Sequence, residues 1–213
     1  MAGSFPNGVP EASFQRLCSV LQRSCDEGKL TSVSGGWQTT RDLCYTSQLR
    51  VTLDQNGGRE IVRKRLLHRV DMSGHTHTGT PTQDAPCRMR FSWKSEQKIS
   101  EPSVEELGVL EGVRHKQRIS FAYKMWRFDL SIIRGAACDS ELAIDEAVSM
   151  AEPSYEVEME LVPSSCPLDK TPAAYLAHSM LLKAQDICGI LLDPPFDRVA
   201  LARPQDLGAS AVW

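Results

Sequence analysis

Apolar residues along this chain recur with two different spacings, and each spacing predicts one kind of element. Over residues 11–25 they recur at helical spacing after Pro10, which predicts an amphipathic helix. Towards the other end, Thr171 and Pro172 form a typical helix start, and the apolar stripe that follows as far as Gly189 predicts a second helix. Each helix has one apolar face, so both are expected to pack on another layer.

Between the two helices, apolar residues alternate with polar ones, which is the spacing of β-strands. Gly57 and Gly58 provide a turn between the first two alternating stretches. For any single stretch, the ordinary interpretation is a strand of an antiparallel sheet whose polar face lies in water. The six predicted strands are 49–54, 61–67, 87–96, 114–121, 126–132 and 155–161.

The charges on these polar faces are segregated by sign. Residues 88–94 read Arg-x-Arg-x-Ser-x-Lys, residues 114–120 read Arg-x-Lys-x-Arg-x-Ser, and residues 156–160 read Glu-x-Glu-x-Glu. Surfaces in water usually mix both signs, and like charges on one strand face repel each other. We therefore predict a barrel whose charged faces line its interior, with basic strands facing acidic ones and helices on the apolar outside. Such an interior would accept a polyanion together with a divalent cation.

Composition places the chain among globular proteins. It has 213 residues, 41% of them hydrophobic, and a mean hydropathy of −0.28, and this length suits one large domain or two small ones. The predicted barrel would occupy residues 1–213 as a single domain. Because it has no run of about 18 apolar residues and its start lacks the features of a secretory signal, we expect neither a membrane span nor secretion. The seven cysteines are odd in number and form no CxxC pair, which favours reduced thiols over disulfides or a zinc site.

The net charge of −3 hides an uneven distribution along the chain. Residues 59–94 carry eight Lys or Arg against three acids, whereas residues 139–160 carry eight acids and neither Lys nor Arg. These opposite charges can meet in the folded protein as a basic site with an acidic corner. With a pI near 6.0 and no helix carrying a basic stripe, the chain is not expected to bind duplex DNA.

Two polar stretches and the end of the chain are predicted to lie outside the regular elements. Residues 72–86 form the first loop, which holds His75 and His77, but two histidines without a third ligand do not make a metal site. Residues 135–153 form a second, acidic loop, and residues 193–213 form a C-terminal tail.

Three motifs stand in an order that resembles one known enzyme family. They are Arg-His-Lys-Gln-Arg-Ile-Ser-Phe at 114–121, Trp-Arg-Phe-Asp-Leu-Ser at 126–131 and Tyr-Glu-Val-Glu-Met-Glu-Leu at 155–161. In this order they resemble the fungal and protozoan metal-dependent RNA triphosphatases of mRNA capping, which are triphosphate tunnel metalloenzymes. The resemblance covers most of residues 8–190 and implies an eight-stranded antiparallel barrel, mainly β with helices packed outside, enclosing a charged tunnel.

The resemblance also implies a function and a set of functional residues. The implied enzyme is a hydrolase, a polynucleotide 5′-phosphatase that converts 5′-triphosphate-ended nascent mRNA to a 5′-diphosphate end, the first step of capping. Asp129 and Ser131 would orient the basic side chains, although the family often has Thr at the second of these positions. Glu158 and Glu160 would hold Mg²⁺ or Mn²⁺, Glu158 would also position the attacking water, and Glu156 would support the site. The implied catalytic residues are Glu158, Lys116, Arg118 and Asp129, and the implied phosphate-binding residues are Arg65, Arg90, Lys94, Arg114, Lys116 and Arg118.

The sequence departs from the family at its start. The family begins with a strand bearing Glu-x-Glu, which supplies metal ligands, but here only Met1 and Ala2 precede the matching connection. Glu156 and Glu160 lie about 13 Å apart along an extended strand, so the triple-glutamate strand can give one ion two ligands at most. Three explanations of the departure are open: an incomplete sequence, a strand supplied by a partner or by N-terminal residues, and loss of catalysis. We favour the first because the later motifs are intact.

Two other functions are open. The barrel could be a catalytically impaired scaffold or transcription-complex subunit, although a scaffold has no need of charge-segregated interior faces. It could also act on another triphosphate, such as thiamine triphosphate or polyphosphate. The resemblance further implies a nuclear location, a homodimer, and partnership with mRNA guanylyltransferase and the 5′-triphosphate end of RNA.

Overall fold

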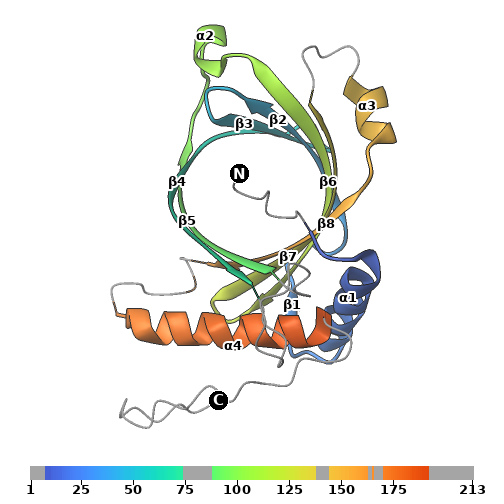
Figure 1. Cartoon of the computed structure of the whole chain (residues 1–213), viewed down its shortest axis with the longest axis vertical. Helices are drawn as coiled ribbons and strands as arrows, with labels where there is room; N and C mark the ends of the chain where they lie inside the picture. Colours follow the sequence, from blue (N-terminus) through green and yellow to red (C-terminus); the bar gives the residue numbers. More distant parts are fainter. Residues whose placement is uncertain (1–7, 74–87, 138–143, 163–164, 166–169, 192–213) are drawn as a thin grey trace.

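The computed structural model describes residues 8–73, 88–137, 144–162, 165 and 170–191. Their main feature is one antiparallel sheet in the order β5-β4-β3-β2-β6-β7-β8, which curls into a ring (Figure 1). A further strand of two residues, β1 (Thr31–Ser32), pairs with β6. The strands of the curled sheet are β2 (Gln38–Tyr45), β3 (Leu49–Asp54), β4 (Arg59–Ser73), β5 (Arg88–Lys98), β6 (Leu110–Tyr123), β7 (Trp126–Ala137) and β8 (Ser154–Leu161). The predicted antiparallel barrel architecture is thereby confirmed as a curled sheet.

The helices lie on the outside of this curl (Figure 1). Helix α1 (Glu11–Asp26) and helix α4 (Ala173–Leu191) cover β6, β7 and β8, and two short helices, α2 (Val104–Leu107) and α3 (Ile144–Met150), lie elsewhere on the outer surface. Phe14 of α1 packs against outward-facing residues of the sheet, including Phe121 and Leu130, and all three are fully buried. Since alternate strand residues point to opposite faces, the charged residues between these apolar ones point into the curl.

A close backbone contact fixes where α1 begins. The Val9 N–H donates a hydrogen bond of 2.7 Å to the Tyr155 carbonyl of β8. Gly8 has φ near 95°, and a Cβ at this position would lie 2.8 Å from the same carbonyl oxygen, so only glycine fits. The Phe14 ring packs against the Tyr155 ring with the centroids 5.1 Å apart and the planes tilted by 51°, and this contact holds the helix on β8.

The structure corrects several boundaries. Strands β1 and β2 were not predicted, because neither segment shows simple alternation of apolar and polar residues. Helix α4 continues through Gly189 to Leu191, β4 includes Met72 and Ser73, and α3 lies within the expected loop 135–153, whose first residues belong to β7. His75, His77 and the tail 193–213 lie outside the described residues.

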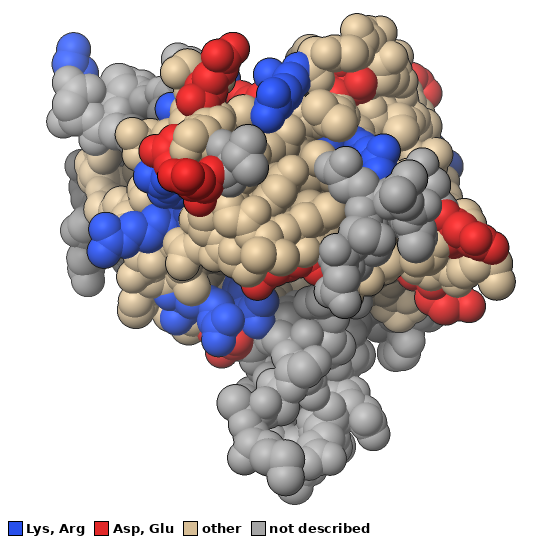
Figure 2. Space-filling model, turned by 90° about the horizontal axis from the view of Figure 1, so that it is seen from above, with Lys and Arg blue, Asp and Glu red and all other residues tan. Residues whose placement is uncertain are grey.

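None of the described cysteines, Cys18, Cys25, Cys44 and Cys188, forms a disulfide. Among the helices of the described chain, none is both long and apolar enough to cross a membrane. On the face shown in Figure 2, Lys and Arg lie in small groups beside Asp and Glu rather than in one broad field.

Candidate active site

The register of the sheet brings charged residues of three neighbouring strands onto the inward face. In one row, Arg118 of β6 lies opposite Ser131 of β7, and Ser131 lies opposite Glu156 of β8. In the next row, Asp129 of β7 lies opposite Glu158 of β8. Residues two apart on a strand share a face, so the rows stack along the interior. The inward face therefore gathers most of the residues that the resemblance implies, namely Lys116, Arg118, Asp129, Ser131, Glu156, Glu158 and Glu160.

Asp129 lies at the centre of this face and is fully buried. Its Oδ2 accepts a hydrogen bond of 3.1 Å from Arg127 Nε and lies 3.3 Å from Arg118 Nη1. Arg118 also donates to Ser131 Oγ and to Glu158 Oε2, each at 3.3 Å. Three oxygen acceptors on two strands thus hold one guanidinium in place. The structure therefore places Asp129 and Ser131 against a basic side chain that the resemblance assigns to phosphate binding.

Asp129, Glu158 and Glu160 form an acidic cluster, with one carboxylate oxygen from each lying within 4.8 Å of the others. Glu160 forms a salt bridge with Arg127 of the adjacent strand. The second oxygen of Asp129, Oδ1, is buried and has no hydrogen-bond partner among the described residues. An unpartnered buried carboxylate oxygen is costly, and Mg²⁺ and Mn²⁺ prefer oxygen ligands. The acidic cluster therefore fits a divalent cation.

Lys116 supplies a buried positive charge on the same face, two residues from Arg118. Lys116 is only 8% exposed. Burial, together with the neighbouring charge of Arg118, lowers the pKa of Lys116 below its ordinary value of 10.5, although Glu158 and Asp42 partly oppose this. A buried cation with incompletely balanced charge favours an anionic ligand beside it.

Strand β2 adds a buried carboxylate that the sequence did not indicate, Asp42, which is 3% exposed. Asp42 lies opposite Thr52 of β3 on one side and Arg114 of β6 on the other. The Thr52 hydroxyl donates a hydrogen bond of 2.7 Å to Asp42 Oδ1, and Arg50 Nη1 lies 3.9 Å from Asp42 Oδ2. Asp42 therefore joins β2 to β3 through Thr52 and Arg50, on the inward face that also carries Arg114. It could not be found from the sequence because 38–45 shows no alternation of apolar and polar residues.

Replacing Thr52 by Val should destabilise the fold by about 1–2 kcal/mol, because it leaves Asp42 with one hydrogen bond fewer in a buried site. Urea denaturation of the variant would measure the change in the free energy of unfolding. Thr40→Val is a matched control, since Thr40 lies on the same inward face of β2 and makes no hydrogen bond through its side chain with a described residue. Equal stability of both variants would contradict the role given to the Thr52 hydroxyl.

The opposite wall of the interior is formed by β4 and β5. Lys64 forms a salt bridge with Glu96, and Lys94 shares their face. Arg90 donates two hydrogen bonds to Asp71, of 2.7 and 3.2 Å, and these hold the pKa of Asp71 below its usual range. Of the phosphate-binding residues that the resemblance implies on β5, Lys94 and Arg90 thus both face inward, and Arg90 already has a carboxylate partner.

Arg65 is placed differently from the other implied phosphate-binding residues. It lies opposite Ser95, whereas its neighbour Lys64 lies opposite Glu96 and faces the interior. Since adjacent residues of a strand point to opposite faces, Arg65 points outward. The run of three basic residues from Arg63 to Arg65 puts positive charge on both faces, so the sequence alone could not identify the inward one. Lys64 is the residue of this run that points into the interior.

Arg127 is a further residue of the site that the sequence analysis missed. It bridges Asp129 and Glu160 and thereby joins β7 to β8 within the acidic cluster. Its position two residues before Asp129 places it on the same strand face, so alternation within the Trp-Arg-Phe-Asp-Leu-Ser motif could have identified it.

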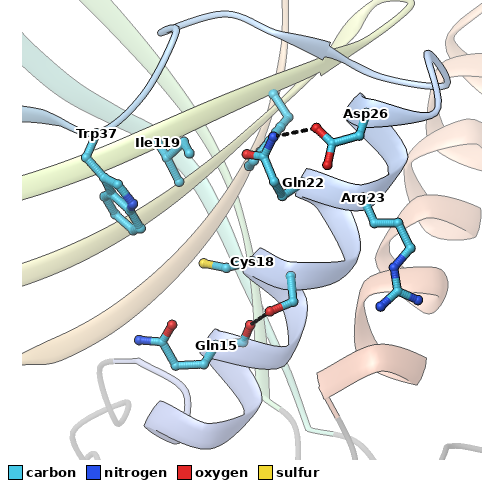
Figure 3. A pocket seen from close by; sticks show the side chains of 9 residues that line it. Gln15, Cys18, Gln22, Arg23, Asp26, Trp37 and Ile119 are labelled. Carbon is cyan, nitrogen blue, oxygen red and sulfur yellow. Dashed lines mark hydrogen bonds between the residues drawn. The ribbon is translucent and has the colours of Figure 1, made fainter.

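A separate hollow of about 470 Å³ lies on the outside of the sheet, between α1 and β6 (Figure 3). Trp37 and Ile119 line one side, and Cys18 and Gln22 of α1 line the other. Burial raises the pKa of the Cys18 thiol to about 11, so it stays protonated near neutral pH and is a poor nucleophile. The hollow therefore offers no reactive thiolate near neutral pH.

No family model matches the sequence, and no curated protein matches it. Among solved structures, the chain is similar to the Pct1 RNA triphosphatase of S. pombe, with a TM-score of 0.56 and 16% identity over 85% of this chain and 62% of that chain. Pct1 in complex with the Spt5 CTD gives a TM-score of 0.56 and 14% identity over 85% of this chain and 68% of that chain. The chain thus spans less than two thirds of the first of these. At this identity the likeness is one of fold, and the chain has the triphosphate-tunnel fold seen in the Pct1 RNA triphosphatase.

Proposed function

We propose that this protein hydrolyses the terminal phosphoanhydride bond of a triphosphate, and that its substrate is the 5′-triphosphate end of nascent mRNA. The reaction yields a 5′-diphosphate end, the first step of mRNA capping. One observation carries the proposal: the cations Lys116 and Arg118 lie on the same inward face as the acidic cluster. Phosphoryl transfer requires both kinds of group, because cations neutralise the phosphate oxygens while carboxylates hold a metal and orient water.

Each residue then has a distinct role. Lys116 and Arg118 bind phosphate oxygens. Arg114 lies two residues before Lys116 on the same inward face of β6 and adds a further positive charge. Glu158, which contacts Arg118, orients the attacking water in line with the γ-phosphoryl group. Asp129 positions Arg118 through its Oδ2. A divalent cation, Mg²⁺ or Mn²⁺, bound at the acidic cluster would add positive charge against the γ-phosphoryl oxygens.

The proposal predicts that the protein releases inorganic phosphate from RNA carrying a γ-labelled 5′-triphosphate, and that EDTA abolishes the release until Mg²⁺ or Mn²⁺ is restored. The assay measures the amount of labelled phosphate released over time, after separation from the RNA. An RNA of the same sequence with a 5′-monophosphate end is the control substrate. If neither metal supports release from RNA, tripolyphosphate or nucleoside triphosphate, the enzyme proposal is wrong.

Calorimetric titration with tripolyphosphate separates this proposal from a scaffold built on the same fold. Binding that disappears in Arg118→Ala supports a phosphate site, whereas no measurable binding favours the scaffold. Relative rates on RNA, thiamine triphosphate and tripolyphosphate identify the substrate. A nuclear location, a homodimer and association with mRNA guanylyltransferase follow from the capping role, and we propose them together with it.

A further inference from the structure

The outward face of the β4–β5 pair carries a second group of basic residues that the proposed active site does not use. Arg59, Arg63 and Arg65 alternate with inward residues along β4, so all three point outward. Each is exposed, and none forms an ion pair or hydrogen bond with a described residue. By contrast, the inward cations Lys64 and Arg90 of the same two strands are each paired with a carboxylate.

An exposed tryptophan lies beside these arginines. Trp93 of β5 is 72% exposed, and the register places it opposite His68. Trp93 and Ser95 are two residues apart on the same outward strand face, and Ser95 lies opposite Arg65. The outward positions of β4 and β5 contain no acidic residue, while the neighbouring outward residues of β3, Leu49 and Val51, are apolar. Among the described residues, Trp93 therefore presents an open aromatic face beside outward strand positions that carry positive charge and no carboxylate.

We infer that this outer surface, formed by Arg59, Arg63, Arg65, His68 and Trp93, binds the body of a single-stranded RNA. Unpaired guanidiniums bind phosphates, and an exposed aromatic ring stacks on an unpaired base irrespective of sequence. Arg63 and Arg65 lie about 6.6 Å apart along the strand, so each can engage a different phosphate of an extended chain. The inference rests on the proposed function only in naming RNA as the polyanion.

Two other occupants of this surface fit the observations less well. A second copy related by a two-fold axis would bring the arginines of both copies together, and like charges repel. A duplex would offer no unpaired base to stack on Trp93, since its bases are already stacked. A single strand satisfies both the cations and the ring.

The test uses a mixed-sequence RNA of about 15 nucleotides with a 5′-hydroxyl end, so that no triphosphate engages the interior. Arg63→Ser/Arg65→Ser should weaken binding and lower the slope of log K against log salt by about 1.4, since each phosphate contact on a single strand contributes about 0.7. Arg23→Ser/Lys29→Ser removes the same charge from exposed positions around α1 and should leave the affinity within twofold of wild type.

Trp93→Ala should weaken binding about 5- to 150-fold and abolish the quenching of tryptophan fluorescence by RNA. Because Trp93 is exposed, this variant should retain the circular dichroism spectrum and melting temperature of wild type. Unchanged affinity in both the arginine and tryptophan variants overturns the inference, as does tighter binding of polyglutamate than of RNA. A change from dimer to monomer in Trp93→Ala, with RNA affinity retained, would identify the surface as a contact between copies and would also overturn it.

Phosphate release from tripolyphosphate keeps this result separate from the proposed function, because tripolyphosphate has no RNA body. Release without RNA binding at the outer surface would leave the enzyme proposal standing and refute only the RNA surface. RNA binding that depends on Trp93, without release from any triphosphate, would do the reverse.

Discussion

Replacing Glu158 by Gln is expected to slow phosphate release from triphosphate-ended RNA by about 100- to 1,000-fold. The substitution keeps the shape of the side chain but removes its negative charge, so the acidic cluster loses one of its three carboxylates. Glu158 also accepts a hydrogen bond from Arg118, and the neutral amide holds that guanidinium less strongly. Initial rates with saturating Mg²⁺ would measure the loss.

The matched control for this change is Glu105→Gln on α2, which makes the same substitution at an exposed position on the outer surface. Its rate should stay within twofold of wild type. Because both variants lose one negative charge, comparing them separates the position of Glu158 from the change in net charge. A rate for Glu158→Gln within about threefold of wild type would contradict the assigned role.

Replacing Lys116 by Met is expected to make the protein less active and more stable. Phosphate release should fall by about 100-fold or more, because a cation aimed at the phosphate oxygens is lost. The free energy of unfolding at pH 7 should rise by about 0.5–2 kcal/mol, which is the gain that a single stabilising substitution commonly gives. Met fills a similar volume without a charge, so it relieves the burial of an ammonium beside Arg118.

The pH dependence of this stability difference follows from the direction of the pKa shift. The pKa of Lys116 is lowered in the folded protein, so the unfolded chain binds the proton more tightly. Wild type therefore carries the full penalty at neutral pH, and the penalty is lost as pH rises from the folded pKa towards 10.5. Urea denaturation of wild type and Lys116→Met at pH 7 and pH 10 should show a smaller difference at the higher pH. A difference that grows with pH would show that buried charge is not its cause.

The core of the site could be predicted because alternation survives in the sequence. Lys116 and Arg118, like Glu158 and Glu160, are two residues apart, and this spacing alone puts each pair on one face of a strand. Segregation of charge by sign then indicated that the polar faces meet in an interior rather than in water. The fold confirmed this, because the intervening residues Phe121 and Leu130 are buried under the helices.

Other parts of the site depended on contacts that a linear pattern does not contain. The hydrophobic pattern did not reveal Asp42, since the segment around it has no apolar alternation and its burial depends on Thr52 and Arg50 of the next strand. Arg65 illustrates the opposite case, in which a basic run marks a strand but does not show which face each residue occupies.

The sequence by itself determined the class of fold and the inward set of charges on β6, β7 and β8. It could do so because side-chain direction in a strand follows from local geometry, with a period of two. The tertiary structure decided which charges meet, including the contacts of Asp129 with two arginines, the buried place of Asp42 and the outward place of Arg65 beside Trp93. Those outcomes depend on the register between strands far apart in the chain, which is set by the packing of the whole sheet.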